Sequence, residues 1–240
     1  MPGEPLHAVV VKTVDVGDAH QIVHLLSHEE GQSSVFSRNA RSSKKRFAGV
    51  WDPGNQVRVY SSQGKGGLPA AKDVDLVASP RQARKSIVRI GLLAYGLEVC
   101  WSLAPMNHEA PKLFRLMLTW LDVLEQSVEA GPGSRIALEA KALTFAGLTP
   151  GLVRCVRCQG ELQEPLVFEP GAGGVQHQHC GAGVAVSVQA MLEAERLRRT
   201  PLLDTLSSPS VFPNPWVLSD FIRYQLGHEL KSRAFLESIG

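Results

Sequence analysis

The spacing of apolar and polar positions changes near residue 80. Before that point, short segments are rich in β-branched residues or alternate between polar and apolar, as strands do. Turn sequences such as Pro53-Gly54-Asn55 separate them. The predicted strands cover residues 7–16, 21–27, 32–37, 56–60 and 74–78. Five short strands predict a small closed barrel of the OB type, and an SH3-like barrel or a small sandwich would give much the same pattern.

After residue 80, apolar positions recur every three or four residues, which predicts helices. The expected helices cover residues 87–101, 111–124, 134–145 with Ser134 as N-cap and Gly147 beyond the end, 188–199, and one from 214 to about 236. The glycine-rich residues 151–186 interrupt them and are too few for a core of their own. We therefore predict an α+β multi-domain chain. It comprises an OB-fold nucleic-acid-binding domain (1–79), an α-helical domain (80–150 and 187–240) and an inserted zinc-ribbon-like knuckle (151–186).

Three of the four cysteines lie in that insert and have the spacing of metal ligands. Cys155 and Cys158 form a C-x2-C pair, and after eighteen intervening residues His177 and Cys180 form H-x2-C. Two such pairs can close a tetrahedron around one Zn²⁺, and four protein ligands leave no open position for catalysis. The neighbouring His179 is the alternative ligand to His177. A redox C-x2-C without metal, or a remnant that no longer holds metal, are the competing interpretations.

Positive charge is concentrated in the loop after the third predicted strand. No carboxylate occurs between Glu30 and Asp52, where the chain carries Arg38, Arg41, Lys44, Lys45 and Arg46. A second acid-free stretch, residues 76–97, carries Arg81, Arg84, Lys85 and Arg89. Both stretches are candidates for contact with a nucleic-acid backbone, and solvated loop charge is the alternative.

Few aromatic residues are available to stack on bases in the predicted barrel. Phe47 and Trp51 follow the basic loop and could stack on bases or lie in the core, and for Trp51 we favour the core. Few aromatics favour recognition of the backbone over bases, and hence little sequence specificity. Three histidines recur every four residues, at His20, His24 and His28. They could be metal ligands, but we prefer to interpret them as surface residues of the barrel.

Composition excludes several classes of protein. The chain has 240 residues, 44% of them hydrophobic, with 25 Lys and Arg against 23 Asp and Glu. Its longest apolar stretch has eight residues, whereas a spanning helix needs about 20. The N-terminal region lacks the apolar segment of a signal peptide, so we expect a cytoplasmic protein. Phosphate-binding loops, nucleophile elbows and metalloprotease motifs are missing, and we expect no enzymatic activity.

The order of barrel, helices and Cys/His insert resembles the RecO family of bacterial recombination mediators. Four local similarities support this. They are Gly17-Asp18 with residues 22–27 and Gly31, residues 39–44, the spacing of Cys155, Cys158, Gly173-Gly174 and Cys180, and residues 230–236. Two positions depart from the family pattern. His177 stands where the family usually has cysteine, and residues 51–54 replace an apolar-Gln-Pro-aromatic stretch.

The resemblance implies a DNA repair and recombination mediator that is not an enzyme. Such proteins bind single- and double-stranded DNA, anneal complementary strands, engage the acidic C-terminal tail of single-strand-binding protein and, with RecR, help load the RecA recombinase onto coated DNA. It also implies a nucleoid-associated protein with one structural zinc ion, and a groove for the acidic tail in the helical domain, which we expect near residues 81–89. The DNA contacts that it implies are Lys12, Arg38, Arg41, Lys44, Lys45 and Arg46.

Two other functions remain compatible with the residues alone. A general module of barrel and zinc ribbon could bind RNA or a protein partner, which a preference for RNA over DNA would reveal. A metal-dependent nuclease would need an open metal position and a base, and the sequence offers neither.

Overall fold

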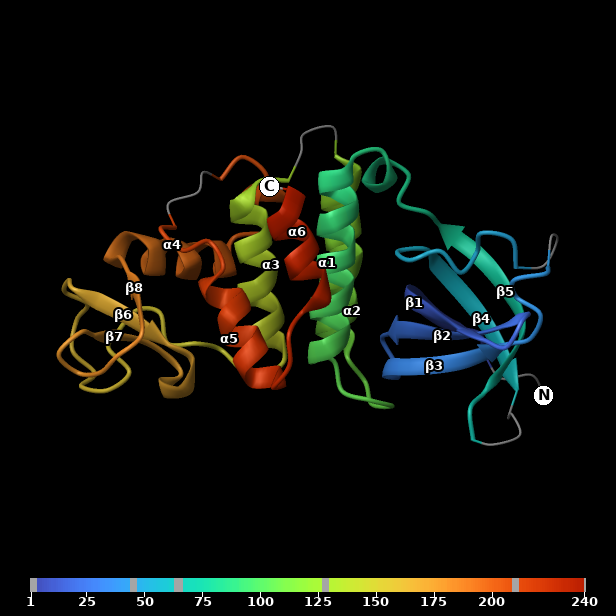
Figure 1. Cartoon of the computed structure of the whole chain (residues 1–240), viewed down its shortest axis with the longest axis horizontal. Helices are drawn as coiled ribbons and strands as arrows, with labels where there is room; N and C mark the ends of the chain where they lie inside the picture. The colour runs from blue at the N-terminus through green and yellow to red at the C-terminus, as the bar shows by residue number, and fades with distance from the viewer. Residues whose placement is uncertain (1–3, 44–46, 63–66, 127–129, 209–211, 240) are drawn as a thin grey trace.

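The N-terminal part of the chain is a closed five-stranded barrel (Figure 1). The computed structural model describes residues 4–43, 47–62, 67–126, 130–208 and 212–239. The strand order is β1-β2-β3-β5-β4, β1 also pairs with β4, and β3 pairs in parallel with β5. This is the topology of an OB fold, so the predicted barrel is confirmed. The strands are β1 (Leu6–Val16), β2 (His20–Ser27), β3 (Gly31–Ser37), β4 (Gln56–Ser62) and β5 (Ala70–Ala78).

The barrel core explains the aromatic residues near the basic loop. Buried and partly buried positions alternate along β3, because its odd-numbered residues point inward. Phe47 and Trp51 lie in this core with their rings stacked at a centroid distance of 5.8 Å. The Trp51 indole N–H donates to the hydroxyl of Ser37 at 3.0 Å. Trp51 is therefore a core residue as predicted, and the suggestion that Phe47 stacks on bases is wrong.

Six α-helices follow among the described residues, with two departures from the predicted pattern. Ser134 is not an N-cap, because the third helix begins at Pro132 and the buried Ser134 hydroxyl donates to the carbonyl of Thr205. The predicted final helix is two helices, since Gly227 adopts a left-handed conformation with φ 71°. The helices are α1 (Ile87–Leu103), α2 (Pro111–Glu125), α3 (Pro132–Phe145), α4 (Val188–Arg199), α5 (Val217–Leu226) and α6 (Lys231–Ile239). Short 3-10 turns are η1 (Gln82–Arg84), η2 (Pro170–Ala172) and η3 (Leu202–Thr205).

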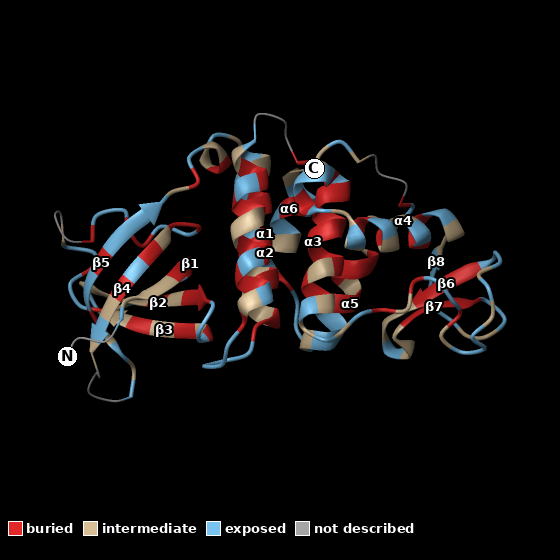
Figure 2. Cartoon of the chain, turned by 180° about the vertical axis from the view of Figure 1, so that it is seen from behind, coloured by how far each residue is buried: buried red, intermediate tan, exposed pale blue. Residues whose placement is uncertain are grey.

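The barrel and the helices share an interface on which α1 and α2 stand beside the sheet (Figures 1 and 2). Val9, Val11 and Leu26 point out of the barrel and belong to the helical core. The loop between α1 and α2 pairs with the turn between β2 and β3. Gly31, at φ 56°, makes this approach possible, since a Cβ there would lie 2.2 Å from the carbonyl oxygen of Pro105.

The insert forms a three-stranded sheet at the end of the molecule opposite the barrel (Figure 1). Its strands are β6 (Leu166–Glu169), β7 (Gly174–His177) and β8 (Val184–Val186), in the order β7-β6-β8. Leu166, Phe168 and Val175 from this sheet are part of the helical core, and Phe168 packs edge-to-face on Phe221 of α5. The insert therefore depends on the helices for its packing. None of the helices in the described residues is long and apolar enough to cross a membrane.

Candidate metal centre and DNA-binding surface

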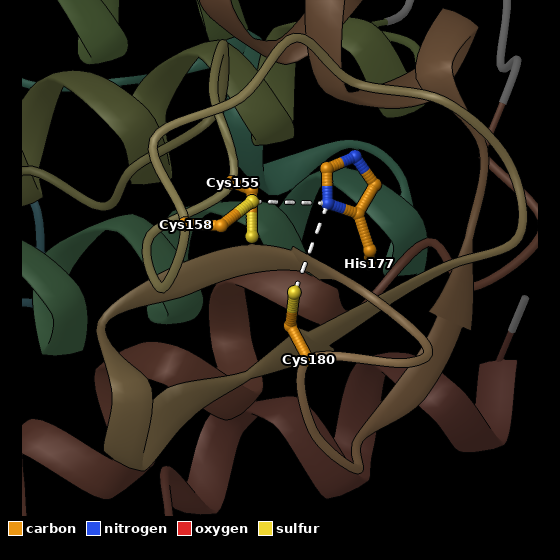
Figure 3. A group of neighbouring side chains, drawn as sticks. All are labelled: Cys155, Cys158, His177 and Cys180. Carbon is orange, nitrogen blue, oxygen red and sulfur yellow. Dashed lines mark hydrogen bonds between the residues drawn. The ribbon is translucent and has the colours of Figure 1, made fainter.

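The four predicted metal ligands come together in the insert (Figure 3). Cys155 and Cys158 lie on a tight turn, closed by hydrogen bonds from the Cys155 N–H to Gly160 and from the Gln159 N–H to Cys155. His177 ends β7, and the next turn brings Cys180 back beside it. The ligand atoms all lie within 4.8 Å of one another, so this group could hold one metal ion.

A backbone contact orients the His177 ring for metal binding. Its Nε2 lies 2.9 Å from the carbonyl oxygen of Glu161, which only accepts hydrogen bonds, so Nε2 carries the proton. The unprotonated Nδ1 then faces Sγ of Cys158 at 3.4 Å and Sγ of Cys180 at 3.9 Å. Such an outer hydrogen bond is typical of histidines that bind metals. The exposed His179 stacks on the His177 ring, 5.0 Å away, and lies outside the group.

Two thiols of the group, those of Cys155 and Cys180, differ in acidity. Burial opposes ionisation of Cys155, but hydrogen bonds from the backbone of Cys158, His177 and Arg157 outweigh it and lower its pKa to about 6. Burial, with the neighbouring Cys158 and Cys155 thiols, raises the pKa of Cys180 to about 11. Since thiolates are the ligands of metals, a metal that binds here would have to displace a proton from Cys180.

The three histidines spaced by four do not gather around a metal. His20 accepts a hydrogen bond from the backbone of Asn39, and His24 pairs with the hydroxyl of Ser34 at 2.9 Å. Among the described residues, the Cys/His group of the insert is the one cluster with the arrangement of metal ligands.

Half of the predicted DNA contacts fall within the described residues. Arg38 is exposed just after β3, and no described residue pairs with its guanidinium. Arg41 lies nearby, 3.5 Å from the Asp15 carboxylate, and both side chains are about half exposed. Lys12, on β1, places its ammonium 4.7 Å from the ring centre of Trp101. Lys44, Lys45 and Arg46 lie outside the described residues.

The second acid-free stretch has a structural role. Arg84 donates to the carbonyl of Pro53 and to the side chain of Asn55, and so ties η1 to the barrel. Arg89 donates to two carbonyls at the end of α2. The carboxylate of Glu125 accepts from the first N–H groups of η1 at 2.7 and 3.1 Å, so the protein supplies its own anion there. Arg84 and Arg89 therefore contact protein groups, whereas Arg81 and Lys85 of the same stretch are exposed. The predicted nucleic-acid contact and the predicted groove for an acidic tail near residues 81–89 stay predictions.

Sequence reasoning missed two surfaces that form only in the fold. Trp101 of α1 lies against the barrel beside Lys12 and His24. A groove of about 320 Å³ between α2, α3 and η3 is lined by three cations, with apolar side chains between them. The groove residues include Lys112, Arg115, Leu116, Lys141, Phe145 and Leu202. Helical periodicity gave no signal for either surface, because each joins segments distant in the sequence.

Comparison with known proteins agrees with this architecture over almost the whole chain. The family model "Recombination protein O N terminal" matches residues 4–80, and "Recombination protein O C terminal" matches residues 84–234. The DNA repair protein RecO of Myxococcus xanthus is 34% identical over 240 residues, which cover 97% of this chain and 96% of that protein. RecO of Anaeromyxobacter sp. is 33% identical, with 98% and 96% covered, and RecO of Desulfatibacillum aliphaticivorans is 28% identical, with 100% and 98% covered. The chain therefore belongs to the RecO family of DNA repair proteins.

Proposed function

We propose that this protein is a recombination mediator that acts without catalysis. It binds single- and double-stranded DNA, anneals complementary strands and, with RecR, helps load RecA onto DNA coated by single-strand-binding protein. The observation that supports this most is an OB barrel with a basic loop at the end of β3, in a chain of the RecO family. We also propose that the barrel, the helices and the insert are three separate domains of the chain.

The proposed DNA-binding surface is the basic loop, whose sequence carries Arg38, Arg41, Lys44, Lys45 and Arg46. Cations that contact phosphates release counterions, so binding weakens as salt increases, with a log-log slope of about −0.7 per phosphate contact on single strands. The loop offers cations, whereas the aromatic rings that follow it, Phe47 and Trp51, are buried in the barrel core, which favours contact with phosphates over bases. Such binding suits a protein that must act on any sequence.

Annealing of two complementary single strands without nucleotide, at several salt concentrations, tests this function. We expect fast annealing that salt suppresses. Arg38→Ala should make the salt slope of DNA binding shallower by about 0.7. Arg58→Ala is the matched control, since Arg58 is an exposed arginine on β4 that pairs in register with Asp75, outside the basic loop. No annealing, with binding insensitive to salt, would refute the proposed activity.

We further propose that the metal is one Zn²⁺ with a structural role. Three thiolates and one imidazole suit tetrahedral zinc, and four protein ligands leave no position for a water to react. Metal analysis of the purified protein should give one zinc per chain, and Cys155→Ser and His177→Ala should each reduce it. His179→Ala is the matched control, because it removes the neighbouring ring outside the group. Full zinc content in both ligand variants would refute the assignment.

The groove between α2, α3 and η3 is the site that we propose for the acidic tail of single-strand-binding protein. Its cations attract carboxylates, and Leu116, Phe145 and Leu202 offer an apolar surface to the end of such a peptide. A fluorescent tail peptide should bind with salt-sensitive affinity, and Arg115→Ala should weaken it. Arg154→Ala, on the exposed surface of the insert, should have no effect. Equal binding by both variants would exclude this groove.

The alternative function is a module that binds RNA or a protein partner. Competition between RNA and DNA strands of the same sequence tests it, since proteins distinguish the two mainly through the 2′-hydroxyl. Tighter binding of RNA would favour the alternative.

A further inference from the structure

Two cavities meet at one aromatic residue where the barrel contacts the helices. The larger, of about 750 Å³, lies between β1, α1 and α6. The smaller, of about 470 Å³, lies between β2, β3 and the loop that follows α1. Trp101 and Gln32 line both. We call this pair of cavities the Trp101 cleft, and each is within the range of ligand pockets, about 300–1,000 Å³.

The cleft offers aromatic surface that the barrel alone lacks. The Trp101 ring is partly exposed, with the Lys12 ammonium 4.7 Å from its centre and the His24 ring edge-on at 5.5 Å. Its indole N–H is buried and has no hydrogen-bond partner in the described part of the chain. Phe235 of α6 lines the larger cavity and is 38% exposed. Two aromatic side chains thus border a space that no side chain fills.

Two lysines of the larger cavity are available to an anionic ligand. Lys12 and Lys231 line it, and their ammonium groups have no carboxylate partner among the described residues. The carboxylate of Glu98 also lines it, but its oxygens accept hydrogen bonds from the backbone of Lys231 and Ser232 at 3.0 and 2.8 Å. Glu229 pairs with Arg223 at 2.9 Å. Glu98 keeps its negative charge, but its oxygens are held by the backbone of α6, and Glu229 is paired with Arg223. Neither carboxylate pairs with Lys12 or Lys231 in the described part of the chain, so both ammonium groups are available to a phosphate.

We infer that single-stranded DNA crosses the Trp101 cleft with one base stacked on Trp101 and its phosphate near Lys12 and Lys231. This inference rests on the proposed DNA binding and adds a base-stacking residue to it. The faces of strands 2 and 3 are a common binding surface of OB folds, and the smaller cavity lies against these strands. Burial, then the charge of Lys12, lowers the pKa of His24, so this ring adds no charge that would repel Lys12. Duplex DNA keeps its bases stacked and cannot make the contact.

Binding of single- and double-stranded DNA by one variant tests the inference. Trp101→Leu keeps an apolar side chain and removes the ring. We expect it to bind oligo(dT) roughly five- to 150-fold more weakly, the range of one base-aromatic stack. Duplex binding should change less than about twofold, and the salt slope should stay the same because no phosphate contact is lost. Trp101→Phe should restore part of the single-strand affinity.

Quenching of tryptophan fluorescence gives a second measurement on the unaltered protein. Trp51 and Trp120 are at most 4% exposed, and Trp216 lies beside the guanidiniums of Arg135 and Arg233. Quenching by oligo(dT) should therefore come from Trp101, be lost in Trp101→Phe, and not occur with duplex DNA.

The outcomes separate this inference from the proposed function. Unquenched binding of oligo(dT), or equal weakening of single- and double-stranded binding in Trp101→Leu, would overturn the stacking role and leave DNA binding intact. If Trp101→Leu does not fold, the quenching experiment decides alone. Failure of the unaltered protein to bind any DNA would overturn the proposed function and the inference together.

Discussion

Gly31 is the residue on which the contact between barrel and helices depends most directly. It lies at the start of β3 with φ 56°, and the loop between α1 and α2 passes over it. A Cβ at this position would lie 2.2 Å from the carbonyl oxygen of Pro105 and 2.7 Å from that of His108. Gly31→Ala therefore combines a strained backbone with a collision against main-chain atoms, which cannot rotate away.

The magnitude follows from these two effects. An alanine in the left-handed region costs about 1–2 kcal/mol. Moving the loop breaks the hydrogen bonds nearest the collision, from Gln32 N–H to Pro105 at 2.8 Å and from His108 N–H to Glu30 at 3.1 Å. Each contributes about 0.5–1.5 kcal/mol net. The expected loss is thus about 2–5 kcal/mol of unfolding free energy.

Gly17→Ala is the matched control. Gly17 has nearly the same φ, 60°, but no heavy atom lies within 4 Å of the position of its Cβ. Its substitution should cost the strain alone, about 1–2 kcal/mol. Urea unfolding followed by circular dichroism measures both variants. Equal destabilisation would mean that the loop moves without cost, and the proposed role of the close contact would be wrong.

Three further predictions concern the metal and the ion pairs. Removal of the metal with a chelator should lower the Tm by about 5–11 °C. The reason is that free metal at a concentration of about a hundred times its Kd adds about 2.7 kcal/mol to the free energy of unfolding. An unchanged Tm would contradict a structural metal. Glu139 is fully buried and pairs with Arg135 at 2.5 Å. Glu139→Ala should therefore lower the free energy of unfolding, measured in urea, by about 3–5 kcal/mol. Glu139→Gln should lower it less, because it keeps an acceptor for the hydroxyl of Tyr95. Hydrogen bonds from Arg198 lower the pKa of Glu195, so its stabilising effect is present above the ordinary carboxyl pKa and is lost as pH falls through the lowered value. Glu195→Gln should flatten that acid limb of the stability curve, and an unaltered limb would exclude this contribution.

Local patterns in the sequence were enough to predict the barrel and the metal group. Segments that are rich in β-branched residues or alternate between polar and apolar gave all five strands. The spacing of Cys155, Cys158, His177 and Cys180 gave four ligand atoms that the fold brings together. Both predictions succeed because the two-residue period of a strand and the spacing of two chelating residues depend only on residues close together in the sequence.

The sequence was a poor guide to the role of a residue where that role depends on tertiary contacts. Ser134 is a residue type that often caps helices, but its hydroxyl donates to the carbonyl of Thr205, 71 residues away. The sequence also gave no sign that the guanidiniums of Arg84 and Arg89 donate to carbonyls of distant segments. Trp101 fits the apolar face of α1, and only the barrel packed beside it turns that position into one wall of a cleft. Composition along the chain does not encode such partners.

The cap that Glu98 provides to α6 has a consequence for how the protein matures during synthesis. The carboxylate of Glu98 accepts from the backbone of Lys231 and Ser232, more than 130 residues later in the chain. The barrel can fold early, since its strands are complete by Ala78 and domains generally fold as units from the N-terminus. The wall that α6 contributes beside Trp101 forms only after Lys231–Ile239 has left the ribosome. A nascent chain would thus hold a finished barrel while the helices are still being made, and would complete the cleft only once α6 has emerged.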